Sequence, residues 1–151
     1  MPKKTSIEAY FSLEKNEPDY DFAISAVTDR LGILPTKTKK KGEWVNMSSP
    51  PKRKHSYTQW KYRTGRIETY NFEMVIKQIV HTFKDKVDTI NELKQELQLE
   101  PKLCAVVYVE DGISPGYLIE SEVMQFAINI GAELEIDDFI SGFVENEIDN
   151  E

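Results

Sequence analysis

A two-residue alternation of apolar and polar side chains predicts three strands in the first half of the chain. In residues 6–14 the apolar side chains occupy the odd positions, which is typical of a half-buried strand. The basic segments 36–47 and 57–64 are also expected to be extended, and the second is rich in aromatic residues and threonine. The segment between them, 46–55, contains two prolines and two serines. We therefore predict a β-hairpin with an unusually long connection.

Apolar residues recur at helical spacing in three other segments, 21–31, 72–97 and 121–130. The longest is expected to break near residues 85–88, because the mean helix has only about 11–12 residues. The candidate N-caps are Asp19 or Asp21 for the first helix, Asn71 and then Asp88 or Thr89 for the two halves of the second, and Ser121 for the last. Gly32 and Gly131 suit the left-handed position that ends a helix.

Two further strands are predicted near the end of the chain. Residues 102–110 form a nearly continuous apolar run, which is typical of a central strand covered on both faces. Residues 132–140 alternate between apolar and acidic side chains and predict a final strand.

The order of these elements predicts an α+β fold. Helices packed on one face of a mainly antiparallel sheet bury both sets of apolar side chains, so we expect a single domain with two to four helices on one face. The 151 residues fit one domain, which we place at 6–141. It lies between a short N-terminal tail, 1–5, and an acidic C-terminal tail, 142–151.

Charge is distributed unevenly along the chain. Residues 1–66 carry 14 Lys and Arg against 7 Asp and Glu, whereas residues 67–151 carry 5 against 19. The densest basic segment, 36–66, has ten basic residues and only Glu43 opposing them. One interpretation is that the two halves pair with each other in the fold. The other is that each presents a separate face to a partner.

The sequence offers little for catalysis or for binding a metal. The two histidines, His55 and His81, lie in different predicted elements, and Cys104 begins an apolar strand, where a core role is expected. The scattered glycines form no phosphate-binding motif. We therefore predict no catalytic residue, metal or cofactor, although an enzyme with dispersed carboxylates stays open as an alternative.

The compartment follows from what the sequence lacks. The N-terminal segment has no apolar core of a secretory signal, and no apolar run approaches the roughly 20 residues of a membrane span. A single cysteine allows no internal disulfide. We expect a cytoplasmic protein that does not associate with membranes.

Several motifs resemble one protein family. The segment "LGILPTKTKKKGE" (31–43) resembles the signature of a bacterial family catalogued only as domain of unknown function 4279. The matching positions are Leu31, Gly32, Pro35, Thr36, Thr38, Lys41 and Gly42. The strand around Trp60, the helix from Phe72, the strand 103–109 and the end 121–137 are similar to the family's later blocks, so the resemblance covers about residues 6–140. It implies a compact intracellular α+β domain, and it supplies no catalytic residues.

Binding another protein is our first functional hypothesis, because small acidic domains without a catalytic cluster suit electrostatic masking of a basic surface. The role would be of the immunity or regulatory type, and the protein is expected to be a monomer or a homodimer. The residues proposed for this acidic face are Glu133, Glu135, Asp137 and Asp138.

Nucleic-acid binding is the alternative hypothesis, since lysines beside aromatic residues are found in proteins that bind single strands. The sequence pI of about 5.0 argues against it. The residues proposed for this face are Lys37, Lys39, Lys41, Lys52, Arg53, Lys54, Trp60 and Arg63.

Overall fold

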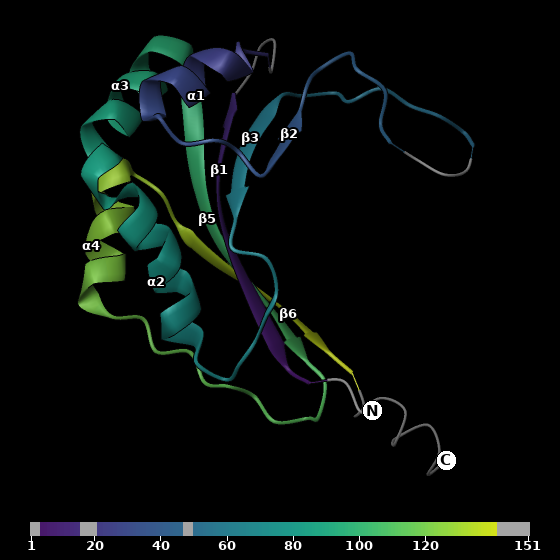
Figure 1. Cartoon of the computed structure of the whole chain (residues 1–151), viewed down its shortest axis with the longest axis vertical. Coiled ribbons are helices and arrows are strands. Elements are labelled where there is room, and N and C mark those ends of the chain that lie inside the picture. The colour runs from purple at the N-terminus through teal and green to yellow at the C-terminus, as the bar shows by residue number, and fades with distance from the viewer. Residues whose placement is uncertain (1–3, 16–20, 47–49, 142–151) are drawn as a thin grey trace.

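The fold is built on one six-stranded mixed sheet (Figure 1). The computed structural model describes residues 4–15, 21–46 and 50–141. The strands are β1 (Ser6–Lys15), β2 (Lys37–Lys39), β3 (Gln59–Arg63), β4 (Ile67–Glu68), β5 (Leu99–Val109) and β6 (Leu134–Ile140). Their order is β2-β3-β1-β5-β6, and β4 pairs with the beginning of β1. The predicted α+β fold with a mainly antiparallel sheet is confirmed, and the β5–β6 pair is parallel.

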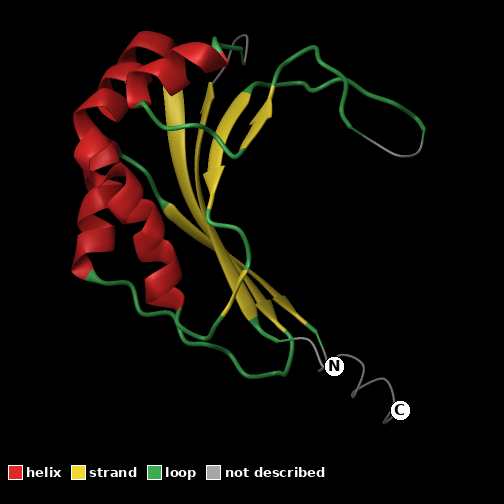
Figure 2. Ribbon diagram, viewed as in Figure 1, coloured by secondary structure: helices red, strands yellow, loops and turns green. Residues whose placement is uncertain are grey.

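All four described α-helices lie on one side of the sheet (Figure 2). They are α1 (Ile24–Leu31), α2 (Phe72–Phe83), α3 (Val87–Leu97) and α4 (Ser121–Ile130). A single 3-10 turn, η1 (Lys84–Lys86), separates α2 from α3, so the predicted break of the long helical segment is confirmed. The other side of the sheet carries no described helix.

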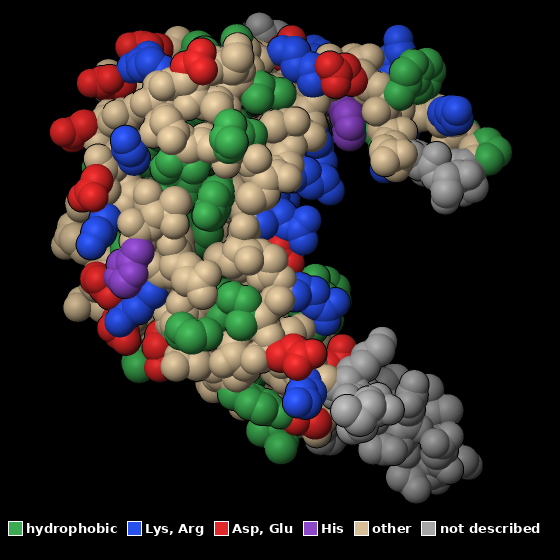
Figure 3. Space-filling model, viewed as in Figure 1, with side chains coloured by type: hydrophobic (Ala, Val, Ile, Leu, Met, Phe, Trp, Pro, Cys, Tyr) green, Lys and Arg blue, Asp and Glu red, His purple; other side chains and the backbone are tan. Residues whose placement is uncertain are grey.

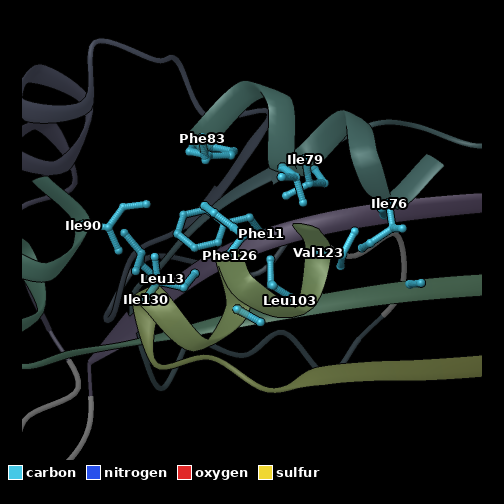
Figure 4. Packing of buried hydrophobic residues seen from close by; sticks show 14 of the residues in the cluster. Phe11, Leu13, Ile76, Ile79, Phe83, Ile90, Leu103, Val123, Phe126 and Ile130 are labelled. Carbon is cyan, nitrogen blue, oxygen red and sulfur yellow. The ribbon is translucent and has the colours of Figure 1, made fainter. Parts of the chain in front are cut away.

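The apolar residues at alternating positions of β1 form part of the sheet side of the hydrophobic core. Ile7, Ala9, Phe11 and Leu13 are all fully buried against the helices, as Figure 4 shows for Phe11 and Leu13. At the centre of the core, the Phe83 ring contacts the rings of Phe11, with centroids 4.6 Å apart, and of Trp60, 6.1 Å away. The strand and the helix stripes therefore meet in one aromatic cluster.

Glycines end two helices, as predicted, and an asparagine begins a third. Gly32 and Gly131 adopt left-handed backbone conformations, with φ of 69° and 68°. The Asn71 side chain accepts a hydrogen bond from the Met74 backbone N–H at 3.1 Å and caps α2.

The other predicted caps are wrong. The residues that precede α1, α3 and α4 are Ala23, Lys86 and Glu120, and none of them makes a side-chain cap hydrogen bond. The Asp21 carboxylate instead accepts hydrogen bonds from its neighbour Phe22 and from the Thr58 hydroxyl. Asp19 lies outside the described residues.

The prediction that the apolar strand is covered on both faces is also wrong. Helices cover only one face of β5, and long side chains from neighbouring strands cover part of the other, so that Cys104 is 1% exposed while Val106 and Tyr108 are half-buried. The short strand β4 was not predicted. Of the two predicted tails, residues 1–3 and 142–151 lie outside the described residues, and Thr5 is buried.

Candidate functional site

The helix-free face of the sheet is lined by the polar positions of the strand pattern. The strand pairing places Tyr10 of β1 between Arg63 of β3 and Cys104 of β5, and Cys104 lies opposite Glu135 of β6. By the same alternation, this face carries Lys37 and Lys39 of β2, Lys61 and Arg63 of β3, Glu8 and Ser12 of β1, Lys102 and Tyr108 of β5, and Glu135, Asp137 and Phe139 of β6.

Cations and aromatic rings stack on each other across this face. The Lys61 ammonium lies 4.1 Å from the centre of the Tyr10 ring. The Arg66 guanidinium lies 3.6 Å from the centre of the Tyr108 ring, which in turn stacks on Phe139 at 5.5 Å. In such contacts a long side chain can cover apolar surface while it keeps its charge in water.

One ion pair on this face has a buried carboxylate and a partly exposed guanidinium. The Glu8 side chain is 4% exposed and forms a bidentate ion pair with the Arg63 guanidinium. The hydrogen bond to Glu8 raises the pKa of Arg63. Arg63 is therefore committed to a structural contact.

The cysteine on this face has the properties of a core residue. Burial raises the pKa of the Cys104 thiol, and it also raises the pKa of the neighbouring Tyr10 phenol. A buried thiol with a raised pKa holds little of the thiolate that a nucleophile requires. The prediction that Cys104 is a core residue agrees with this geometry.

A basic cleft of about 820 Å³ lies at the β2 edge of the sheet. It is lined by β2 and by residues 43–46 and 53–57 of the long connection between β2 and β3. We call this connection, residues 40–58, the arm. The described part of the arm extends away from the body of the protein and borders the hollow seen on one side of Figure 3. The cations that line the cleft are Lys37, Lys39, Arg53 and Lys54.

Aromatic rings hold two of these cations in place. The Lys39 ammonium donates a hydrogen bond to the Tyr57 hydroxyl at 2.9 Å, and Lys54 lies 5.1 Å from the centre of the Trp44 ring. No carboxylate of the described residues forms a salt bridge with any of the four cations, although Glu43 also lines the cleft. The cleft therefore has positive charge that the described part of the chain does not neutralise.

The structure assembles only part of the predicted nucleic-acid face. Lys37, Lys39, Arg53 and Lys54 meet in the cleft, whereas Arg63 is paired with Glu8. Lys41 and Lys52 are exposed on the arm and do not line the cleft.

Trp60 was wrongly assigned to this face, because its side chain is fully buried under the helices and donates a hydrogen bond to Thr28 at 3.0 Å. The alternation in β3 already contained this signal, since Trp60 falls between Gln59 and Lys61 and so points to the opposite face. The exposed tryptophan is Trp44, at 63%.

The predicted acidic residues lie in and beside β6 at the opposite edge of the sheet. Glu135 and Asp137 project onto the helix-free face, and Asp138 projects toward the helical side. Glu133 precedes the strand, where its carbonyl accepts a hydrogen bond from Leu103. The acidic residues therefore surround the strand on both faces.

An apolar groove adjoins β6 on the helical side of the sheet. The sequence pattern did not predict this groove. It has a volume of about 270 Å³ and is lined by Ile119, Val123, Met124, Ala127, Ile128 and Leu134. Met124 and Ile128 are 49% and 72% exposed. These two residues are four positions apart on α4, next to its buried residues, so they widen the apolar face of the helix. This widened apolar face was the feature of the sequence that could have predicted the groove.

The basic and acidic regions lie far apart in the fold. The edge strands β2 and β6 are separated by β3, β1 and β5, which places them about 19 Å apart at the usual spacing of about 4.8 Å between strands. Cross-pairs between the two halves of the chain do exist elsewhere, for example Arg30 with Glu92 and Glu96. The basic residues of β2 and the acidic residues of β6 therefore do not pair with each other, because they lie at opposite edges of the sheet.

The described residues form no group of three or more His, Cys, Asp or Glu side chains that could hold a metal ion. Among the same residues, no helix has the length and apolar character required to traverse a bilayer.

Comparisons with known proteins give one match. Neither the search of curated proteins nor the search of solved structures found a significant similarity. The family model described as "Domain of unknown function (DUF4279)" matches residues 4–139, which include every described strand and helix except the final residue of β6. The chain therefore belongs to the DUF4279 family.

Proposed function

We propose that this domain binds another protein, and that it does so by adding an extended segment of the partner to β6. The observation that carries the proposal is the free edge of β6, which is flanked by carboxylates and by an apolar groove. The proposed partner segment is basic and carries apolar side chains at alternating positions.

The backbone of β6 supports this mode of binding. β6 pairs with β5 on one side, and no described strand pairs with its other side. All of its residues after Leu134 are exposed. An exposed edge strand has unpaired N–H and C=O groups, and an extended peptide can satisfy them by continuing the sheet.

The groove beside α4 supplies apolar area for such a segment. Ile136 and Ile140 of β6 are exposed by 37% and 53%, on the same side of the sheet as the groove. Alternate side chains of an added strand would point to this side and could cover Met124 and Ile128. Burial of this surface would favour binding by about 25 cal/mol per Å² of apolar area, before the entropic cost of association.

Charge determines which segment fits. No described cation forms a salt bridge with Glu133, Glu135, Asp137 or Asp138. A second copy of the chain pairing with β6 around a two-fold axis would bring these carboxylates against each other, and like charges directly opposite destabilise a strand pair. A basic partner is therefore favoured over a homodimer formed through this edge.

A displayed library of random 12-residue peptides tests the proposal. We expect the selected peptides to alternate between Lys or Arg and large apolar residues. The double variant Glu135→Lys/Asp137→Lys should reverse the selected charge from basic to acidic, and Ile128→Glu should abolish selection because it places a charge in the groove.

Leu34→Glu is the matched control for the groove variant, since Leu34 is 77% exposed and does not line the groove. It should select the same peptides as the wild-type domain. Selection of the same basic peptides by the charge-reversed variant would contradict the proposal, as would a selection with no pattern in charge or spacing.

A further inference from the structure

We propose that the basic cleft beneath the arm is a binding site for single-stranded nucleic acid. This site is separate from β6, because the cleft and β6 lie at opposite edges of the sheet.

The positions of the cations support the binding of phosphates. Lys37 and Lys39 project from β2, whereas Arg53 and Lys54 come from the returning half of the arm, so cations lie on two walls of the cleft. A chain of phosphates in the cleft would meet positive charge on both walls. The described part of the protein provides no salt bridge to these four side chains.

Crowding of like charges in β2 and β3 also favours an anion. Lys37 lies opposite Lys61 in the strand pairing, and Lys39 is two residues away on the same face. Burial, and then repulsion by Lys39 and Lys37, lower the pKa of Lys61. A bound phosphate would relieve this repulsion, because it adds the opposite charge at the same place.

The aromatic residues of the cleft distinguish nucleic acid from other anions. Trp44 lines the cleft and is 63% exposed, although large aromatic rings usually bury most of their surface. Tyr57 also lines the cleft. Proteins that bind single strands combine a positive groove with aromatic rings on which the bases stack. An acidic peptide would neutralise the lysines but would leave the exposed surface of the Trp44 indole uncovered.

The net charge of −7 does not prevent binding at this place. The acidic strand β6 is about 19 Å from β2, which is more than twice the distance of about 8 Å over which physiological salt screens charges. The phosphates would therefore experience mainly the local cations.

Fluorescence anisotropy with a labelled 12-nucleotide oligothymidine tests the inference in the 151-residue chain. The competitors are the corresponding single-stranded RNA, a 12-base-pair duplex and a polyglutamate of 12 residues. We expect the single strands to compete, and we expect the duplex and polyglutamate to compete at least tenfold more weakly. Equal competition by polyglutamate or by the duplex would overturn the proposal.

Two variants separate the roles of charge and stacking. Trp44→Ala should weaken binding about tenfold, whereas Trp44→Phe should retain most of the affinity. Lys37→Ala/Arg53→Ala should reduce the slope of log affinity against log salt by about 1.4, because each phosphate contact on a single strand contributes about 0.7.

Lys84→Ala is the matched control, since Lys84 is an exposed cation in η1 and does not line the cleft. It should leave both the affinity and the salt slope unchanged. Thermal unfolding of each variant checks that the fold is intact, which we expect because Trp44, Lys37 and Arg53 are all exposed. A Trp44→Ala protein that folds and binds as tightly as the wild type would contradict the stacking contact and overturn the proposal.

Discussion

Phe83 is the residue on which the packing of the sheet against the helices depends most. It ends α2, is fully buried, and contacts the rings of Phe11, Trp60 and Tyr62. Two strands that are far apart in the sequence, β1 and β3, therefore pack against one ring of α2.

Phe83→Ala is expected to lower the free energy of unfolding by about 3–5 kcal/mol, because it removes a buried ring and leaves a cavity among other rigid rings. Urea denaturation measures the loss. Phe83→Leu should cost less, since it fills part of the cavity. A change below about 1 kcal/mol for Phe83→Ala would show that the cluster does not have the packing described above.

Asp21 is expected to make stability depend on pH in the acid range. The Lys40 ammonium, 2.8 Å away, and the Thr58 hydroxyl hold the pKa of this carboxyl below its ordinary value of 3.8. The folded state therefore binds fewer protons at Asp21 than the unfolded state does, and this contribution to stability is complete above about pH 4 and declines as the pH falls through the lowered pKa.

The comparison of wild type with Asp21→Asn at pH 6 and pH 3 measures this effect. The variant should be destabilised at pH 6, and the difference from wild type should shrink at pH 3. Lys40→Gln should reduce the acid dependence as well, whereas Lys37→Gln, which removes a cation without a carboxylate partner among the described residues, should not. A difference between wild type and Asp21→Asn that stays constant with pH would contradict the prediction.

At the scale of the secondary-structure elements, most of the fold could be predicted because single periodicities dominate long segments. The alternation in β1 and the stripes in α2, α3 and α4 each identify one buried face, and the structure buries those faces. The helix ends were less predictable. Gly32 and Gly131 follow from backbone geometry, whereas Asp21 bonds to Thr58, a residue 37 positions away that local sequence does not reveal.

The elements that were missed are those that tertiary contacts decide. β4 has only two residues, so no periodicity can identify it. The apolar run of β5 indicated two covered faces, but Tyr10 and Asp137 from neighbouring strands contact Cys104 in place of a second layer of helices. A strand covered by neighbouring side chains and one covered by helices have the same local sequence pattern.

Residues 43–54 of the arm are expected to be dispensable for folding. Among the described residues, none of the buried apolar core residues lies between Leu31 and Trp60. The backbone N–H of Gly42 already donates a hydrogen bond of 2.9 Å to the His55 carbonyl. Replacement of residues 43–54 by Asn-Gly, which favours a tight hairpin turn, should change the free energy of unfolding by less than about 1 kcal/mol.

Urea denaturation of the shortened protein measures this change, and a peptide selection with the same protein provides a second readout. The shortened domain should lose the cleft and the binding of oligothymidine, while it should select the same peptides through β6. A protein that fails to fold without residues 43–54 would contradict the division into a body and an arm.

At the scale of the whole molecule, the sheet separates opposite charges onto its two edges. The sequence revealed the charge asymmetry between the halves of the chain, but it could not reveal where the charges lie. Strand order determines that, and strand order depends on which strands pair across about 90 residues of sequence, as β1 and β5 do. The two candidate surfaces, for a basic peptide and for a single strand, are therefore properties of the topology.

The central place of β1 has a consequence for how the protein is made. Of the described strands, β1 leaves the ribosome first, and it lies in the middle of the sheet, with β3 and β4 on one side and β5 on the other. Its longest pairing, from Ser6 with Tyr108 to Lys15 with Leu99, cannot form until most of the chain has been synthesised. During translation the edge of β1 that pairs with β5 therefore stays unpaired until β5 has been synthesised. Folding of this domain is completed only after its last strands have emerged from the ribosome.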